Sequence, residues 1–341
     1  MSAAPRTVLI TGAAGVVGRA VAAELRCRSI GLVHGDRDVP EVDETLVGDL
    51  EAPRMGLDER AWRSLAERVD AIVHSAALTE WGQPRERYEA VNVEGTRRVI
   101  ELAQAAAAPV HYVSTIFVLA LLDGDDGLSA GNLVREYIRS KLASERLLAA
   151  SGLRHTLFRP TNLVGDSRTG ASSRPQIVQA LSDFVGRGRA PYFPSHPQNL
   201  VDVAPLDALA IPVARAAEAD DVEGTFFVSY GAEAMDVETA LAVVAAHARE
   251  HGREIGDARV VDPREPLPVP LERLRSSVRP FVRVGIDVSE VTHASGGVLP
   301  SSLPELRARF GVPEAEPAQA FRRSLDYWAA QRGREADREG S

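Results

Sequence analysis

Cysteine is almost absent from this chain, because Cys27 is the only one in 341 residues. A single thiol cannot close an internal disulfide or supply a cysteine-based zinc site. We therefore expect a protein of a reducing compartment, and we expect no metal centre.

The sequence also lacks any run of 18 apolar residues, the minimum for a membrane-spanning helix. Its first residues, MSAAPRTVLI, lead into a predicted strand and contain no apolar signal-peptide segment. Acidic residues outnumber basic ones by 48 to 39, and the net charge is −9. Nothing in this balance favours nucleic acid or an anionic membrane as a partner. The expectation is a cytoplasmic globular protein that binds neither.

Lysine is nearly absent as well. The 39 basic residues are 38 arginines and one lysine, Lys141. A GC-rich genome accounts for an excess of arginine, so the arginines carry little information. Lys141 is informative, because a composition that favours arginine this strongly predicts arginine at most basic positions. A lysine that is retained against this bias indicates a specific requirement for lysine.

What is present is enough apolar material for a large core, since 45% of the residues are hydrophobic. Over residues 1–165, short apolar runs alternate with amphipathic stretches, which is typical of a doubly wound α/β fold with a parallel sheet. The predicted strands are Val8–Ile10, Ser29–Val33, Glu44–Val47, Ala71–Val73, Val110–Val113 and His155–Phe158. The predicted helices are Ala20–Leu25, Trp62–Arg68, Tyr88–Ala107 and Val134–Ala150. Ligands of such a sheet bind at the carboxyl ends of the strands, where the unusual residues of this chain fall.

Residues 166–332 have a looser pattern and are predicted to form a smaller substrate-binding lobe, interleaved with late elements of the sheet. Helices are expected at Gln176–Val185 and Ala318–Arg332, and a strand followed by a helix over 224–250. Residues 257–304 are predicted to be irregular proline-rich chain with a helical piece near Leu271–Val278. Residues 333–341 are predicted to be a disordered tail.

A glycine-rich turn follows the first strand and opens the first helix. Its sequence is TGAAGVVG, residues 11–18. Such glycines allow a tight turn and the approach of a pyrophosphate to backbone amides, which predicts a Rossmann-type dinucleotide site. The predicted contacts are Gly12, Ala14, Gly15, Val16, Val17 and Gly18.

The residues after the second strand are expected to read the 2′ position of the cofactor. Asp36 favours NAD, because a carboxylate accepts a hydrogen bond from a ribose hydroxyl. Arg37 and Arg19 favour NADP, because guanidinium groups bind a 2′-phosphate. We favour NADPH over NADH. His34, which also follows the second strand, is a further predicted contact near the 2′ position. Further predicted contacts are Asp49 and Leu50 at the adenine, and Ser75, Ala76 and Ala77 where the cofactor passes the fourth strand.

The single lysine stands four residues after a tyrosine, in Tyr137-Ile-Arg-Ser-Lys141. This spacing places both side chains on one face of a helix. A phenol with a pKa of about 10 is a poor proton donor and acceptor at pH 7, and a neighbouring ammonium is expected to lower that pKa. The same lysine is predicted to bind the nicotinamide ribose. An exposed helix face is the alternative interpretation of the pair.

Other residues complete the predicted site. Thr115, after the fifth strand, is expected to hold a substrate carbonyl beside Tyr137, with Ser114 as the rival hydroxyl. Asn92 is expected to support Lys141 through water, with a helix-surface amide as the alternative interpretation. The turn containing Pro160, Asn162 and Leu163 is predicted to position the nicotinamide carboxamide.

Together these motifs resemble the extended branch of the short-chain dehydrogenase/reductase superfamily. The segments TGAAGVVG, GDL, HSAA, VNVEGT, VST, YIRSK and RPTNLVG match in order and spacing over residues 7–165. Within the branch, HSAALTEWGQPRERYEAVNVEGT, HYVSTIFV, SKLASERLL and FRPTNLVGDSRTG are most similar to the thioester (carboxylic acid) reductase group. The resemblance implies that Thr115, Tyr137 and Lys141 form the catalytic trio and that the cofactor is NADPH.

The implied function is reduction of an acyl thioester to aldehyde or alcohol. The sequence contains no adenylation or carrier domain, so the thioester is expected on a separate acyl or peptidyl carrier protein or on coenzyme A. One alternative is a ketoreductase, epimerase or dehydratase acting on a ketone or nucleotide sugar. A second is a non-catalytic NAD(P)-binding regulator. Branch members are often dimers, so a homodimer is one expected assembly.

Overall fold

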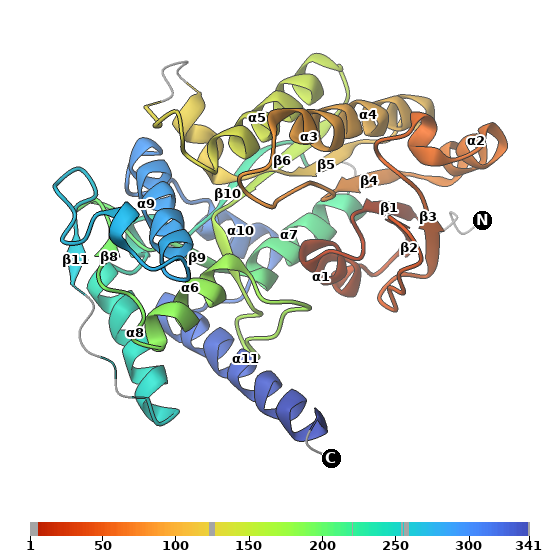
Figure 1. The fold of residues 1–341 in the computed structure, drawn as a ribbon. Helices are drawn as coiled ribbons and strands as arrows, with labels where there is room; N and C mark the ends of the chain where they lie inside the picture. Colours follow the sequence, from red (N-terminus) through yellow and green to blue (C-terminus); the bar gives the residue numbers. More distant parts are fainter. Residues whose placement is uncertain (1–5, 123–126, 220, 254, 256–258, 340–341) are drawn as a thin grey trace.

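A parallel sheet of seven strands forms the centre of the computed structural model (Figure 1). The structure describes residues 6–122, 127–219, 221–253, 255 and 259–339. The strands are β1 (Thr7–Thr11), β2 (Arg28–Val33), β3 (Glu44–Val47), β4 (Ala71–His74), β5 (Val110–Val113), β6 (His155–Pro160) and β10 (Gly224–Val228). Their order is β10-β6-β5-β4-β1-β2-β3. The order therefore reverses between β1 and β4, which is where a doubly wound sheet binds its ligand.

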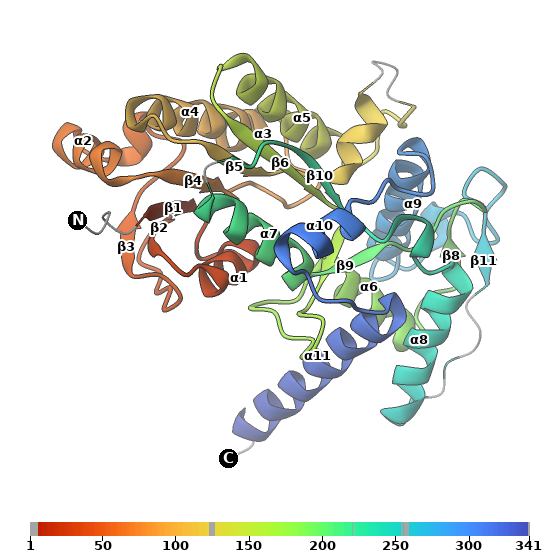
Figure 2. The same ribbon diagram turned by 180° about the vertical axis from the view of Figure 1, so that it is seen from behind.

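The sheet is buried on both faces, and neighbouring residues of one strand belong to two different cores. Val8 and Ile10 of β1 lie in the core beneath α1 (Val16–Glu24), α7 (Leu206–Glu218) and α10 (Leu303–Phe310). Leu9 lies in the opposite core, beneath α2 (Glu59–Arg68) and α4 (Glu94–Ala106). This alternation follows from the two-residue period of a strand. Figure 2 shows α7 and α10 together on their face of the sheet.

The helical layer over β4, β5 and β6 carries the predicted catalytic helix. It consists of α3 (Arg85–Tyr88), a π-helical turn (Glu89–Val93), α4 and α5 (Arg135–Ala150). Among the described residues, short 3₁₀ segments lie at Ile116–Leu121, Gly231–Glu233 and Leu271–Arg273, and Pro53–Gly56 forms a turn in which Arg54 and Met55 have a positive φ. The segment at 116–121 follows β5 directly, so it turns the chain away at the carboxyl edge of the sheet.

A second group of elements lies beside the carboxyl edge of the sheet and forms a lobe. Its helices are α6 (Ile177–Gly186), α8 (Val237–Glu250), α9 (Arg279–Ala294) and α11 (Pro317–Glu339). Its strands form two parallel pairs, β7 (Asn162–Val164) with β9 (Val203–Pro205) and β8 (Phe193–Pro194) with β11 (Val260–Val261). These elements share one apolar core that includes Phe184, Val244 and Phe321.

The predicted α/β class, the six predicted strands and the helices of the first half are confirmed, with ends shifted by a few residues. Elements from the second half of the chain also join the main sheet. Strand β10 pairs with β6, and α7 packs against α1. The division at residues 165 and 332 stays a prediction. Three helices were not expected: α7, α9 and α10.

The predicted disordered tail was wrong through residue 339. Helix α11 continues to Glu339, seven residues beyond the predicted end at Arg332. Residues 340–341 lie outside the described part of the chain, as do residues 1–5 of the first predicted domain. Among the described residues, no helix combines the length and the apolar content needed to cross a membrane.

Candidate active site

The glycine turn joins β1 to α1 and lies against the end of β4. Gly12 has a φ of +71°, and a Cβ atom there would come within 2.7 Å of the Ala76 backbone. A Cβ on Gly18 would come within 2.2 Å of the Gly12 carbonyl oxygen. Both positions therefore require glycine, because the turn folds tightly onto itself and onto the neighbouring strand end.

The N-terminus of α1 has the properties of an anion site. Gly15 is the N-cap residue and provides no side-chain cap, and the first turn contains no acidic residue. The first backbone N–H groups of a helix have no partner within the helix, and the helix dipole favours negative charge there. The predicted contacts Ala14, Val16 and Val17 lie in this turn. These residues fit a dinucleotide pyrophosphate.

The predicted 2′-phosphate residues do not all lie ready for a phosphate. The Arg19 guanidinium is bound to the Glu41 carboxylate at 2.8 Å and donates to the Asp38 carbonyl oxygen at 2.5 Å. Arg37 is exposed on the loop after β2. His34 is also exposed, and its Nδ1 atom lies 4.0 Å from the Asp49 carboxylate. The Arg19 guanidinium is thus already paired, whereas the Arg37 side chain is exposed.

The other predicted cofactor contacts line the same edge of the sheet. The Ser75 hydroxyl donates to the Thr11 carbonyl oxygen at 2.8 Å, which holds the β4 turn against the glycine turn. Ala76 and Ala77 are half-buried in this turn. Asp49 caps the next turn by accepting from the Glu51 amide at 2.8 Å, and the Leu50 carbonyl accepts from Arg98.

Lys141 is buried in α5, with 2% of its surface exposed. Its Nζ atom donates to the Val113 carbonyl oxygen at 2.6 Å and lies 4.2 Å from the centre of the Tyr112 ring. Burial lowers the lysine pKa to about 7, and the Glu145 carboxylate opposes this shift only in part. The exposed-helix interpretation is excluded for this lysine. Its ammonium is placed at the end of β5, beside the residues predicted to bind the substrate carbonyl.

Tyr137 lies one turn before Lys141, near the start of α5. The expectation that Lys141 lowers the pKa of the Tyr137 phenol was wrong for this structure. Burial raises that pKa, and the nearby Tyr88 adds to the rise. The physical reason is that the lysine ammonium is directed to the Val113 carbonyl, while the phenol loses solvent. At neutral pH the phenol is therefore protonated and able to donate.

Thr115 and Ser114 both lie at the end of β5 and are almost fully buried. Thr115 caps the following 3₁₀ segment, because its hydroxyl accepts from the Phe117 amide at 3.4 Å. The Ser114 hydroxyl has no hydrogen-bond partner among the described residues. A buried hydroxyl without a partner is rare, so Ser114 points to a ligand contact and supports the fit of a cofactor here.

Asn92 lies in the π-helical turn, a feature common at functional sites. Its side chain is buried and exchanges two hydrogen bonds with the Leu78 backbone, at 2.7 and 3.2 Å. It also donates to the Ser140 hydroxyl at 2.8 Å. The helix-surface interpretation was wrong. Asn92 joins the π turn to α5 and to the chain after β4.

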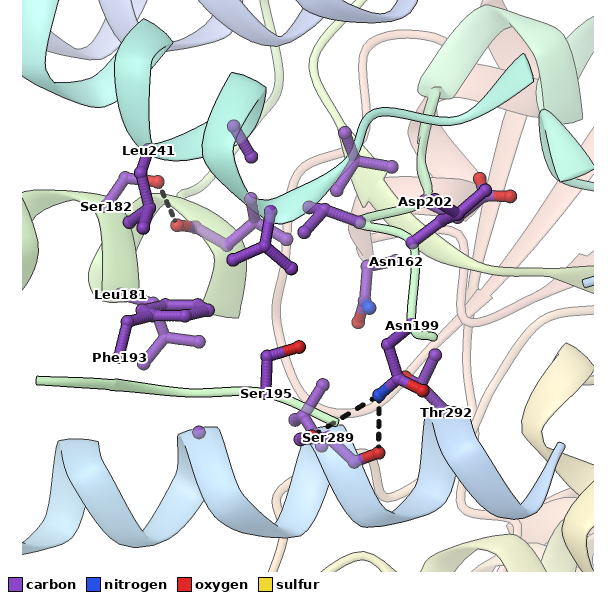
Figure 3. A pocket seen from close by; sticks show the side chains of 18 of the residues that line it. Asn162, Leu181, Ser182, Phe193, Ser195, Asn199, Asp202, Leu241, Ser289 and Thr292 are labelled. Atoms are coloured by element: carbon purple, nitrogen blue, oxygen red, sulfur yellow. Dashed lines mark hydrogen bonds between the residues drawn. The ribbon is translucent and has the colours of Figure 1, made fainter. Parts of the chain in front are cut away.

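The turn after β6 contains the remaining predicted residues. Pro160 ends β6, and Leu163 packs against the core beneath α1 and α7. Asn162 lines a cavity of the lobe, and its side chain points into that space (Figure 3). The predicted contact of this turn with the nicotinamide carboxamide stays a prediction.

The next residues, Gly165–Gly170, carry the narrowest part of the family resemblance, GDSRTG. The Ser167 amide and hydroxyl donate to the Asp207 carboxylate at 2.9 and 2.6 Å. Arg323 of α11 donates to the Ser167 carbonyl at 2.7 Å, and the Ser324 hydroxyl accepts from the Gly165 amide at 3.1 Å. This motif therefore connects the turn after β6 to α7 and α11.

A buried histidine lies behind the predicted catalytic residues. His74 ends β4, and its two ring nitrogens bind the hydroxyls of Thr11 at 2.7 Å and Thr96 at 3.0 Å. Burial, with a smaller contribution from the Lys141 charge, lowers its pKa to about 3. His74 is therefore neutral near pH 7 and serves as a fixed bridge between β1, β4 and α4. The sequence analysis did not single it out.

The cavity of the lobe has a volume of about 120 Å³ and was not predicted. It lies between α6, α8, α9 and the segments around β8 and β9. Phe117, two residues after Thr115, is one of its lining residues. The predicted catalytic hydroxyls and the cavity are thus joined by a single short segment. Most other lining residues belong to stretches without a recognisable motif, so no sequence pattern could have identified them.

Comparisons with known proteins agree with this architecture. A family model described as male sterility protein, of the NAD-binding type, matches residues 41–212, half of the chain. The glycine betaine reductase ATRR of Emericella nidulans is 30% identical over 219 residues, covering 60% of this chain and 17% of that protein. The large chain of L-2-aminoadipate reductase from Candida glabrata is 28% identical over 212 residues, covering 54% of this chain and 15% of that protein.

The chain spans less than a fifth of the length of such curated relatives. Among solved structures, the terminal R domain of the myxalamid PKS-NRPS pathway has a TM-score of 0.71 at 24% identity. That match covers 97% of this chain and 92% of the R domain. The predicted resemblance is confirmed. The chain belongs to the NAD-binding family described as male sterility protein, and it shares the fold of the R domain.

Proposed function

We propose that this protein is an NADPH-dependent reductase of acyl thioesters, giving aldehyde or alcohol. The observation that carries the proposal is the lobe cavity, which Phe117 joins to the catalytic hydroxyls. No arginine, lysine or histidine lies among the described residues that line it. A nucleotide sugar carries a diphosphate, which proteins bind with cations, bidentate arginine above all. An acyl chain makes no such demand.

The cofactor proposal rests on α1 and the loop after β2. The uncapped N-terminus of α1 supports the pyrophosphate. Arg37 is the residue that we assign to the 2′-phosphate, because Arg19 is already paired with Glu41. When bound at the carboxyl edge, the nicotinamide supplies a hydride. Lys141 and Ser114 are the proposed contacts of its ribose and ring.

Proton delivery falls to Tyr137. Its raised pKa keeps the phenol protonated at pH 7, so it is suited to give a proton to the carbonyl oxygen as hydride adds to the carbon. Thr115 donates a second hydrogen bond to that oxygen. The resulting hemithioacetal breaks its C–S bond and releases the thiol, leaving an aldehyde. A second hydride and a second proton give the alcohol. Lys141 is the proposed positioning charge beside the site.

The thioester is proposed to arrive on a separate carrier protein or on coenzyme A. Several relatives are named as PKS-NRPS synthetases, and the R domain is named as a terminal domain of such a pathway. These names describe those proteins. They make a peptidyl or acyl carrier the first partner to test here.

The test is NADPH oxidation, followed at 340 nm, with four substrate classes: acyl-coenzyme A, acyl-carrier thioesters, ketones and nucleotide sugars. We expect turnover with at least one thioester class. Tyr137→Phe is expected to lower kcat about 100- to 10,000-fold while NADPH still binds, because only the proton donor is lost. Tyr327→Phe, on α11, is the matched control and is expected to leave kcat unchanged. Oxidation with ketones or nucleotide sugars alone would refute the proposal, and undiminished turnover in Tyr137→Phe would refute its mechanism.

A further inference from the structure

The lobe cavity contains almost no charge, although it lies in a protein with 26% charged residues. Asp202 is the one ionisable side chain among its described lining residues. Both carboxylate oxygens of Asp202 are already used, by the backbone amides of Tyr230 at 3.1 Å and Gly231 at 2.9 Å. Figure 3 shows this carboxylate directed away from the centre of the cavity. A charged group on a bound molecule would therefore find no partner, and burying it would be costly.

The polar and apolar lining residues are separated within the cavity. Asn162, Asn199 and Thr292 lie together at one end, while Leu181, Leu241 and Phe193 lie at the other (Figure 3). At the apolar end, the hydroxyl of Ser182 is already committed to the Val178 carbonyl of its own helix, at 2.7 Å. That end therefore offers hydrocarbon contacts only.

The polar end adjoins the catalytic residues. Asn162 follows β6, and Phe117 follows Thr115 at the end of β5, so both come from the carboxyl edge of the sheet. Asn199 is almost fully buried and donates to the Ser289 carbonyl at 2.7 Å. Its Oδ1 atom has no hydrogen-bond partner among the described residues. Figure 3 shows this oxygen turned away from the cavity, whereas the Asn162 amide points into it and can accept a hydrogen bond from an N–H or O–H group of a bound molecule.

We propose that the acyl group of the substrate is uncharged, with a hydrogen-bond donor near its reacting carbonyl and an apolar tail that fills the α6–α8 end of the cavity. This inference rests on the proposed thioester reductase function and narrows its substrate class. It separates this chain from an enzyme for a dicarboxylate such as the aminoadipate in the name of one relative. A second carboxylate would require a cation that the described lining does not contain.

The experiment compares three eight-carbon thioesters of pantetheine: octanoyl, 3-hydroxyoctanoyl and suberoyl, the last with a terminal carboxylate. We expect kcat/KM for the suberoyl thioester to be about 100-fold below that of the octanoyl thioester, because a carboxylate at the apolar end is unpaired. For the 3-hydroxy thioester, kcat/KM is expected to exceed that of the octanoyl thioester about fivefold, because its hydroxyl donates to the Asn162 amide oxygen. Equal kcat/KM for suberoyl and octanoyl thioesters would overturn the inference and leave thioester reduction intact.

A protein variant at the apolar end of the cavity also tests whether the lack of a cation there excludes a terminal carboxylate. Leu241→Arg introduces a cation and is expected to raise the suberoyl-to-octanoyl ratio of kcat/KM at least about tenfold. Leu241→Met, the matched control of similar volume, is expected to keep the wild-type ratio. An unchanged ratio in a folded Leu241→Arg protein would count against the proposal.

A binding measurement keeps the inference separate from the reaction. Non-reducible octanoyl and suberoyl amides of pantetheine are titrated calorimetrically into the full chain in the presence of NADP⁺. Tighter binding of the octanoyl amide is expected even if no thioester is reduced, in which case the proposed function fails and the inference on the cavity stands. Equal or tighter binding of the suberoyl amide would refute the inference, whatever the turnover.

Discussion

Replacing Lys141 with methionine is expected to remove a pH dependence from the stability of the folded protein. The side chain is buried, and burial lowers its pKa to about 7 from the usual 10.5. In the unfolded chain the amine holds its proton up to about pH 10.5. Between these values the unfolded state binds more protons than the folded state, so the free energy of unfolding of the wild type rises with pH.

The size of the effect follows from the shift. Each pKa unit corresponds to about 1.4 kcal/mol, so the wild type should gain about 1.4 kcal/mol per pH unit relative to Lys141→Met between pH 7 and 10. The full shift amounts to about 5 kcal/mol. Below pH 7 the difference between the two proteins should be constant, because both states of the wild type are then protonated. Methionine has a similar length and no charge to desolvate.

The assay is urea unfolding of both proteins at pH 6, 7, 8 and 9, with other titrating groups cancelling in the difference. Arg97→Met, an exposed cation on α4, is the control and should show no such slope. A difference that does not change between pH 7 and 9 would refute the argument that Lys141 is held against a large burial penalty. Loss of activity in Lys141→Met together with weaker binding of NADPH would separately support its proposed contact with the nicotinamide ribose.

Three further changes test other parts of the structure. Gly12→Val places a Cβ against the Ala76 backbone, so a steric cost of about 1–3 kcal/mol is expected to raise the Kd for NADPH roughly 10- to 100-fold in a fluorescence titration. Glu145→Gln leaves Arg159 without its buried partner at 2.6 Å, and urea unfolding should show a loss of about 3–5 kcal/mol; a loss below about 1 kcal/mol would mean that the pair is effectively solvated. Arg37→Ala is expected to weaken NADPH about tenfold and leave NADH unchanged, because a charge-assisted hydrogen bond to the 2′-phosphate is lost; equal weakening of both cofactors would contradict the assignment.

The first half of the fold could be predicted because its signals are local. Buried parallel strands appear as continuous apolar runs, and each of the six predicted strands became a strand of the main sheet. The three unexpected helices lack the usual pattern. Helix α7 is buried on nearly all sides and contains Pro212, so it has no polar face. Helix α9 contains Val282-Arg-Val-Gly-Ile-Asp-Val288, in which apolar and other residues alternate as they do in a strand.

In the candidate site, too, local features could be predicted from the sequence and contacts between distant segments could not. Lys141 could be singled out from composition and spacing, but not the carbonyl to which it donates, since Val113 lies 28 positions earlier. Asn92 could be identified from its motif, but its pairing with Leu78 depends on the π turn. The cavity could not be predicted at all. Its lining comes from several separate segments, and only the folded chain brings Asn199 and Leu241 to opposite ends of one space.

The contacts of the GDSRTG segment have a consequence for engineering the chain. Ser324 of α11 binds both the Gly165 amide and the Gln179 side chain, at 3.1 and 2.7 Å. Helix α11 thus connects the turn after β6, at the end of the predicted nucleotide-binding half, to α6, which lines the cavity. Shortening the chain into α11 should loosen the cavity proposed to bind the acyl group before it affects the proposed cofactor site. A carrier domain that is fused to this chain to deliver the substrate is therefore best attached beyond Glu339, because the contacts of α11 with both segments are then kept.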